Sequence, residues 1–383
     1  MPTIAPSPQA QPRKTRLLIV NSTLHIGGAE QVAACLAEHV NRETFETAAC
    51  YLKEPGLIAD QMLRSGVDLV PIPGLRAGHR DYLTFLKLRR LIRSRRIEVI
   101  HTHDIHGMID GAACRLTTPG LRFVHTFHYG NYPDRRIRHK FIEGALSRVA
   151  DALIAVSHSQ AAAIRKLYRI PENRIRVVWN GVEEPKSSEE APRLQWSIPA
   201  GTPVIASIST LIAQKGIGHL LEAAALLRQA GERFVLLIAG DGPLRQGLLA
   251  RSEELGLQGH VQFLGWVPQA SSKVFPLCDI FVQSSLWEAM SIVLLEAMAS
   301  AKPIVATAVG ENPLVMLPGE TGFMVPPANP AALAEALRTL LHDPELRGRM
   351  GQAGRARYQV LFTVQHMISA HEKLYRELAS PSR

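Results

Sequence analysis

Short runs of valine, isoleucine and leucine alternate with longer amphipathic segments along the 383 residues of the chain. The runs lack the polar alternation of a sheet with one solvated face, so we interpret them as buried parallel strands joined by helices. In the first half the expected strands cover residues 16–21, 67–71, 99–102, 123–126, 152–156 and 175–178. This order predicts an α/β fold built from βαβ units.

The pattern is interrupted once and then starts again. Residues 182–203 are rich in proline, serine and glutamate, a composition that favours extended and solvated chain. Beyond them the expected strands cover residues 204–208, 234–239, 261–264, 280–283 and 303–307. No strand pattern follows, and helices are expected over residues 330–342, 344–358 and 363–378.

Two Rossmann-like, doubly wound domains are the expected architecture, because the chain is too long for one ordinary core. The expected parts are a disordered tail (1–14), a first domain (15–185), a linker (186–202), a second domain (203–360) and a C-terminal helix (361–383) that could return to the first domain. Open α/β sheets bind ligands at the carboxyl ends of their strands. We therefore expect the active site in a cleft between the two domains.

Composition narrows the class of protein. No apolar run approaches the roughly 20 residues that span a bilayer, and four scattered cysteines form no metal or disulfide pattern, so a cytoplasmic protein is expected. The net charge of +9 and the pI of about 9.6 favour anionic partners, namely nucleotide diphosphates, lipid head groups or nucleic acid. No nucleic-acid-binding motif accompanies the charge, so we expect no nucleic-acid partner.

The segment 284–298 carries the most informative chemistry. Ser291 is the expected N-cap of a helix that follows a strand, which places Glu288 on the preceding loop and Glu296 about a turn and a half into the helix. Free amides at a helix N-terminus suit a diphosphate, while two carboxylates can accept hydrogen bonds from sugar and ribose hydroxyls. A nucleotide-sugar needs both kinds of group. An ordinary strand-loop-helix with two incidental glutamates is the alternative.

This segment resembles the E-x7-E signature of the GT4 family of retaining glycosyltransferases, and residues 299–307 match the usual continuation. The resemblance implies a GT-B fold with two domains facing a cleft, and a UDP- or GDP-sugar donor. It also implies that neither a cofactor nor a metal is required. His101-Thr102-His103-Asp104 has too few neighbouring ligands to predict a metal site.

Further motifs resemble those of the family, in the same order along the chain. They are Gly27-Gly28-Ala29-Glu30, His125-Thr126-Phe127-His128, Asn180-Gly181-Val182, residues 211–216 with Lys215, Gly240-Asp241-Gly242-Pro243 and residues 263–267. The paired glycines would let the backbone approach a ligand, although a plain tight turn is the better explanation of a double glycine taken by itself. Asp-Gly-Pro likewise forms a turn without any ligand.

The resemblance assigns roles to residues of this chain. The implied catalytic residues are Glu288, which holds the donor sugar, His128, which reaches the sugar from the first domain, and Lys215, which neutralises the diphosphate. The implied donor-binding residues are Glu296 on the ribose, with Gly27, Gly28, Thr210, Gly240, Asp241, Gly242, Ser291, Ile292 and Val293. Several positions depart from the family pattern. Thr210 stands where the family usually has arginine, and Leu314 where it often has glutamate. Ala289, Met290 and Ser291 stand where glycine, phenylalanine or leucine, and proline are more frequent.

The expected activity is a hexosyltransferase of class EC 2.4. It would transfer a sugar with retention to a glycan or lipid-linked acceptor, in the biosynthesis of cell-surface polysaccharide or glycolipid. A sugar-nucleotide epimerase of the same fold and a non-catalytic sugar-nucleotide-binding subunit remain alternatives. An epimerase would differ from a transferase by needing no acceptor, and a binding subunit would differ by showing no turnover.

Two basic runs in the first domain suggest where an acceptor could come from. They comprise Arg89, Arg90, Arg93, Arg95 and Arg96, and then Arg135, Arg136, Arg138, His139 and Lys140 beside Tyr132 and Phe141. Cations next to aromatic rings suit an anionic membrane surface. Peripheral contact with the inner face of the cytoplasmic membrane is therefore expected, with an ordinary solvated helix face as the alternative.

Overall fold

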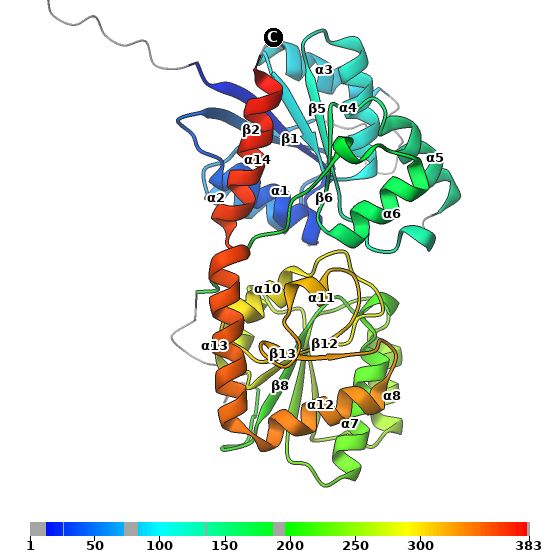
Figure 1. Ribbon diagram of the computed structural model, residues 1–383, viewed down its shortest axis with the longest axis vertical. Helices are drawn as coiled ribbons and strands as arrows, with labels where there is room; N and C mark the ends of the chain where they lie inside the picture. The colour runs from blue at the N-terminus through cyan, green and yellow to red at the C-terminus, as the bar shows by residue number, and fades with distance from the viewer. Residues whose placement is uncertain (1–12, 26, 73–82, 135, 187–195, 381–383) are drawn as a thin grey trace, which may run out of the picture.

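The computed structural model describes residues 13–25, 27–72, 83–134, 136–186 and 196–380. Residues 1–12 of the expected tail, residues 187–195 of the expected linker and Arg135 lie outside the described residues. Two α/β domains are stacked along the long axis of the molecule, and the C-terminal segment runs along both of them (Figure 1).

The first domain contains a seven-stranded parallel sheet with the order β3-β2-β1-β4-β5-β6-β7. Its strands are β1 (Thr15–Thr23), β2 (Phe45–Glu54), β3 (Asp68–Pro71), β4 (Val99–Thr102), β5 (Arg122–Phe127), β6 (Ala152–Ala155) and β7 (Ile175–Val177). Its helices are α1 (Gly28–His39), α2 (Leu57–Arg64), α3 (Thr84–Ser94), α4 (Ile105–Thr117), α5 (Ile137–Leu146) and α6 (His158–Tyr168).

The second domain contains a six-stranded parallel sheet with the order β10-β9-β8-β11-β12-β13. Its strands are β8 (Val204–Ile208), β9 (Val235–Ala239), β10 (Val261–Gly265), β11 (Ile280–Gln283), β12 (Ile304–Thr307) and β13 (Gly322–Val325). Its helices are α7 (Ile217–Gln229), α8 (Arg245–Glu254), α9 (Ala270–Val274), α10 (Ile292–Ala299), α11 (Asn312–Val315), α12 (Pro330–His342) and α13 (Pro344–Leu361).

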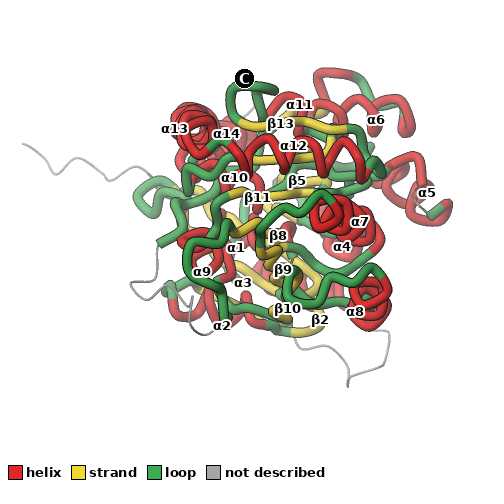
Figure 2. Tube along the Cα trace, turned by 90° about the horizontal axis from the view of Figure 1, so that it is seen from below, coloured by secondary structure: helices red, strands yellow, loops and turns green. Residues whose placement is uncertain are grey.

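Helices cover both faces of each sheet, which explains the unbroken apolar runs in the sequence. In β1, Leu17 and Ile19 enter the core on one face of the sheet, whereas Leu18 and Val20 enter the core on the other. All four side chains are buried. Figure 2 shows the strands lying between layers of helices. The expected architecture of two Rossmann-like domains is confirmed.

Two strands were not expected from the sequence. β2 has charged residues at both ends and only partial burial, so its apolar centre is short. β13 has four residues, two of them only half-buried, at the edge of the second sheet. The expectation that no strand follows residue 307 is therefore wrong, because the short apolar run of residues 323–325 pairs with β12 as an edge strand.

The chain passes between the domains twice, at neighbouring places. Val182 donates its amide to the carbonyl of Phe362 at 3.0 Å, and the amide of Val364 donates to the carbonyl of Val182 at 3.1 Å. The two crossing segments are so close that a Cβ at Gly181 would lie 2.3 Å from the oxygen of Thr363. α13 lies on the second domain, and the last helix, α14 (Val364–Ala379), lies on the first (Figure 1).

α14 is part of the hydrophobic core of the first domain. Its buried residues Met367, Ile368, Leu374 and Tyr375 belong to the same apolar cluster as Leu17 and the buried face of α1. The helix contacts α1 and β4. The first domain is thus completed by residues that follow the second domain in the sequence.

Candidate functional site

The N-terminus of α10 lies at the boundary between the domains. Ser291 caps the helix, and its Oγ accepts a hydrogen bond from the amide of Leu294 at 3.3 Å. Among the described residues, the amides of Ile292 and Val293 have no acceptor. A Cβ at Gly28 of the first domain would lie 3.5 Å from Cδ1 of Ile292. The start of α1 thus lies next to the start of α10, and a side chain at Gly28 would make only an ordinary van der Waals contact there.

Glu288 and Lys215 form one partly buried ion pair beside this helix. Lys215 Nζ lies 2.5 Å from Glu288 Oε1, and the two side chains are 22% and 7% exposed. Glu288 Oε1 also accepts from Ser285 Oγ at 2.8 Å, and Oε2 accepts from Gln214 Nε2 at 3.3 Å. The family resemblance implied that Glu288 holds the donor sugar and that Lys215 neutralises the diphosphate. In the structure the two side chains form an ion pair with each other.

The backbone that carries Lys215 is fixed to the loop that carries Glu288. Leu286 donates its amide to the carbonyl of Gln214 at 2.7 Å, and Ser284 Oγ donates to the carbonyl of Lys215 at 2.9 Å. Gly216 has a φ of 60°, and a Cβ there would lie 2.1 Å from the oxygen of Ser284. This close approach requires glycine, so the Lys-Gly pair is a structural as well as a chemical motif.

Glu296 lies on α10 with a different environment. Its carboxylate accepts a hydrogen bond from the hydroxyl of Ser271 on α9. Burial raises the pKa of Glu296 to about 7, and the hydrogen bond from Ser271 only partly offsets this increase. The side chain is therefore an acceptor whose charge changes close to neutral pH.

The turn after β9 holds Gly240, Asp241 and Gly242 against the segment after β8. A Cβ at Gly240 would lie 1.9 Å from the oxygen of Ser209, and the carbonyl of Asp241 accepts from the amide of Leu211 at 2.9 Å. The Asp241 carboxylate accepts from the amide of Gly242 at 2.7 Å, and its side chain is exposed. Backbone packing alone thus explains both glycines.

Thr210 lies beside this turn at the carboxyl end of β8. It is exposed, and its carbonyl accepts from the amide of Ile212 at 3.0 Å. The side chain therefore faces solvent next to the segment that carries Lys215. A hydroxyl at this place can donate a hydrogen bond but cannot supply the positive charge of an arginine.

The first domain contributes the loops after β1 and β5. At Gly27, a Cβ would lie 2.3 Å from Oε2 of Glu30, so the glycine leaves room for that carboxylate. Burial raises the pKa of the Glu30 carboxyl. After β5, a Cβ at Gly130 would lie 2.5 Å from the carbonyl carbon of Glu288. The loop that carries His128 thus packs directly on the loop that carries Glu288.

His128 belongs to a cluster of imidazoles that the sequence did not predict. Its Nε2 lies 3.0 Å from Nδ1 of His103, whose ring centroid is 4.2 Å from that of His101. His101 Nδ1 lies 2.6 Å from the hydroxyl of Tyr375 on α14. Burial lowers the pKa of His128 to about 3, so its ring is neutral at physiological pH. Of the two histidines in residues 101–104, His103 contacts His128 directly, and His101 lies against His103.

The sequence analysis did not predict the contact that Glu311 makes with the first domain. Glu311, on the loop after β12, is fully buried and accepts hydrogen bonds from the first domain. Its acceptor role depends on residues more than a hundred positions away, so no local pattern could predict it. The described residues contain no group of three or more histidine, cysteine, aspartate or glutamate side chains arranged to bind a metal ion.

Comparison with protein families gives two matches that together span most of the chain. Residues 26–184 match the family described as Glycosyltransferase Family 4, and residues 188–357 match the family described as Glycosyl transferases group 1. The two matches correspond to the first and second domains of the structure.

Individual proteins show the same similarity. The chain is 31% identical to the alpha-D-kanosaminyltransferase of Streptomyces kanamyceticus over 56% of its own length and 57% of that enzyme, and thus spans just over half of it. It is 26% identical to the O-antigen chain mannosyltransferase C of Escherichia coli, covering 68% of this chain and 70% of that enzyme. The solved structure of Anabaena HepE in complex with UDP and glucose superimposes with a TM-score of 0.84 at 19% identity, covering 94% of this chain and 99% of that one.

Proposed function

Because the chain belongs to the GT4-type glycosyltransferases with a GT-B fold, we propose that it transfers a hexosyl group from a UDP- or GDP-sugar to a glycan or lipid-linked acceptor, with retention of configuration. The observation that carries the proposal is the position of the Lys215–Glu288 pair beside the capped N-terminus of α10, at the boundary between the domains.

The donor would bind mainly to the second domain. The free amides of Ile292 and Val293 and the ammonium group of Lys215 would bind the diphosphate, since a helix N-terminus and a cation both favour negative charge. Glu288 would then accept hydrogen bonds from hydroxyls of the sugar. Glu296 would accept hydrogen bonds from the ribose. The UDP bound to HepE supports a nucleotide donor of this kind.

Transfer would proceed by displacement on one face of the sugar. The bond between the anomeric carbon and the phosphate oxygen breaks, the acceptor oxygen attacks from the same side, and the leaving phosphate takes the acceptor proton. Lys215 and the helix amides stabilise the charge that develops on the leaving group. His128, neutral and held by His103, would donate a hydrogen bond to the sugar from the first domain.

Donor screening tests this proposal. Calorimetric titration with UDP, GDP and ADP should identify one preferred base, and turnover of the matching nucleotide-sugars should require an added acceptor. Release of an epimerised sugar without acceptor would identify the enzyme as an epimerase instead. Binding without any turnover would contradict the transferase function of this chain.

The charge of Glu296 should make nucleotide affinity depend on pH. With a pKa of about 7, the carboxyl is mostly protonated at pH 6 and mostly ionised at pH 8. Ribose hydroxyls bind best to the ionised form, so the proton must leave before binding. We expect UDP or GDP to bind about tenfold more weakly at pH 6 than at pH 8, measured by calorimetry.

Glu296→Gln is the matched control, because the amide does not titrate while the phosphates of the nucleotide titrate as before. The variant should lose the part of the pH dependence that comes from Glu296. An identical pH profile in the variant would exclude Glu296 from the ribose site.

The structure also bears on membrane contact. α3, α4 and α5 lie side by side on the first domain, and we call their outer surface the basic apolar face. Its exposed apolar residues are Leu83, Leu86, Ile109, Leu116, Ile137 and Phe141, and its exposed arginines are Arg90, Arg93, Arg136, Arg138 and Arg148. Apolar side chains surrounded by cations match an anionic lipid surface, so we propose that this face holds the enzyme to a membrane carrying its acceptor.

Several residues of the predicted membrane surface are buried or make contacts within the folded protein instead. Tyr132 is only 1% exposed, so Phe141 is the aromatic residue available to lipid. Arg95 pairs with Asp68, and Arg89 donates to the carbonyl of Thr117 at 3.2 Å. No helix in the described parts of the chain combines the length and the apolar stretch needed to cross a bilayer.

Vesicle flotation tests the basic apolar face. The protein should float with phosphatidylglycerol vesicles at low salt and remain unbound with neutral phosphatidylcholine, since surface attraction to anionic lipid is screened by salt. Replacing both Ile137 and Phe141 with serine should lower recovery several-fold. Val360→Ser, which changes an exposed apolar residue at the end of α13, should leave recovery unchanged. Equal recovery with both lipids would refute the contact.

A further inference from the structure

Glu311 is a carboxylate of the second domain that is bonded to the first. It lies between β12 and α11 and is 0% exposed. Its oxygens accept from the amide of His158 at 3.0 and 2.9 Å and from the amide of Ser159 at 3.4 Å, both at the N-terminus of α6. Trp179 Nε1 donates to Oε1 at 2.8 Å, and His158 Nδ1 lies 2.6 Å from the same oxygen. Within the described residues, all side-chain acceptor bonds of Glu311 come from the first domain.

These bonds depend on the domains being together. A carboxylate without partners in the protein interior is strongly disfavoured, whereas the positive end of a helix and several N–H donors stabilise it. α6 is a helix of 11 residues, and Glu311 occupies its N-terminal end from across the domain boundary. If the domains separated, both the carboxylate and the end of α6 would lose these partners and would have to be solvated by water instead. Glu311 therefore favours the closed arrangement.

The same loop touches the segment that presents Glu288. The amide of Glu311 donates to the carbonyl of Ala289 at 3.1 Å, and a Cβ at Gly310 would lie 2.3 Å from the oxygen of Glu288. From the other side, Gly130 of the first domain lies close to the same peptide. The backbone of Glu288 is thus held between Gly310 and Gly130, directly next to the residue that joins the domains.

We propose that Glu311 is a positioning residue that couples closure of the two domains to the placement of Glu288. The proposal rests on the proposed function in so far as Glu288 acts on the donor sugar. Glu311 itself does not touch the donor, because its carboxylate is fully occupied by the first domain. Its effect on transfer passes through the loop 288–289 and through the alignment of the two domains.

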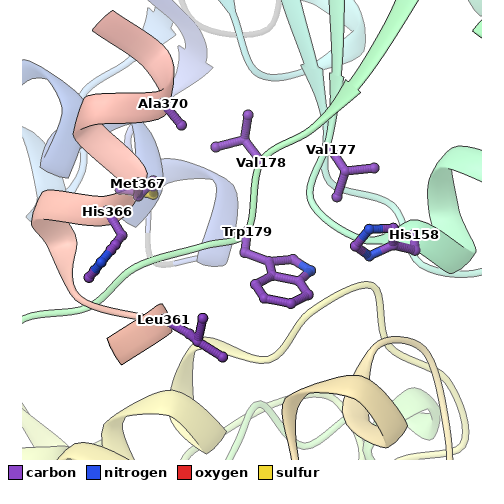
Figure 3. A pocket seen from close by; sticks show the side chains of 8 residues that line it. All are labelled: His158, Val177, Val178, Trp179, Leu361, His366, Met367 and Ala370. Carbon is purple, nitrogen blue, oxygen red and sulfur yellow. The ribbon is translucent and has the colours of Figure 1, made fainter. Parts of the chain in front are cut away.

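The fluorescence of Trp179 can be used to monitor the contact between Glu311 and the first domain. Its ring is half-buried and lies 5.5 Å from the ring of His158. Both side chains line one side of a pocket of about 250 Å³ at the crossing between the domains, opposite Met367 of α14 (Figure 3). The tryptophan is thus close to solvent, and its fluorescence should change when its hydrogen bond to Glu311 is lost.

The test uses the full chain with Glu311→Ala, Glu311→Gln and Trp179→Phe, and Glu320→Ala as the control at an exposed glutamate of the same domain. For Glu311→Ala we expect kcat to fall about thirtyfold, the dissociation constant of the nucleotide to stay within about twofold, and the radius of gyration in solution scattering to increase. Glu311→Gln should lie between alanine and wild type, because one oxygen still accepts. Trp179→Phe should change kcat in the same direction by less, and Glu320→Ala should resemble wild type.

The outcomes separate this proposal from the proposed function. Fluorescence difference spectra against Trp179→Phe and solution scattering do not need turnover. They therefore test the contact between Glu311 and the first domain even if no donor is found. An unchanged radius of gyration and unchanged Trp179 emission in Glu311→Ala would show that Glu311 does not hold the two domains together, and would overturn the proposal. An opened molecule with wild-type kcat would overturn the coupling to Glu288. A nucleotide dissociation constant weakened as much as kcat would also overturn it, since the residue would then belong to the donor site.

Discussion

Replacing Glu288 with alanine is expected to lower kcat at least about a hundredfold, with the affinity for UDP or GDP within about threefold of wild type. Interactions that form mainly in the transition state commonly contribute factors of this size. The nucleotide affinity should not fall, because removing the carboxylate frees the charge of Lys215, which we propose binds the diphosphate. Steady-state kinetics and calorimetry with the preferred donor provide the measurement.

The main complication is the ion pair itself. Removing one partner of a buried pair leaves the other without compensation, which can destabilise a protein. The thermal midpoint of the variant should therefore be measured, and Glu288→Gln should be included because it keeps the shape and removes the charge. Turnover near the wild-type rate in either variant would refute the assignment of Glu288.

Replacing Lys215 with methionine is expected to affect both binding and turnover. The variant loses the positive charge that we propose lies next to the diphosphate, so the nucleotide dissociation constant should increase about tenfold and kcat/KM should fall by about a thousandfold. Lys215→Arg should recover part of the affinity, since it restores the charge with a different geometry. Calorimetry and kinetics with the same donor measure both effects.

The structure suggests why binding and turnover should differ in this variant. Without the ammonium group, Glu288 keeps only its hydrogen bonds from Ser285 and Gln214 among the residues that the structure describes, so the carboxylate that would hold the sugar is also less well placed. Lys166→Met, at an exposed lysine of α6, controls for a general loss of positive charge. Equal losses in the two variants would mean that Lys215 has no specific role.

Most of the fold could be predicted because buried parallel strands have a strong sequence pattern. β1 illustrates this, since its apolar residues serve cores on both faces of the sheet and no polar alternation interrupts them. β2 and β13 lack that pattern, because one carries charged ends and the other is a short edge strand. Strand length alone did not decide which strands could be found, because β3 is also a four-residue edge strand and was expected, whereas the ten-residue β2 was not.

The candidate site was predictable where its chemistry follows local sequence. The N-cap at Ser291 follows from a backbone rule that acts over a few residues, whereas Gly216 was found only through its resemblance to a family motif. The direct pairing of Lys215 with Glu288 was not predictable, because it depends on how two loops of the second domain pack together. The contacts of His128 with His103, and of Glu311 with His158, likewise depend on the three-dimensional arrangement.

The double crossing of the chain limits how the enzyme can be divided for experiments. An expression fragment that ends before residue 187 would contain every strand of the first sheet but would lack α14, and the apolar side chains that Tyr375 and Met367 cover would face water. Such a fragment would be prone to aggregate unless residues 364–379 were supplied on a separate peptide or joined through a short artificial connection. The second domain, by contrast, draws its sheet and α13 from one continuous stretch of sequence and can be expressed as a single piece.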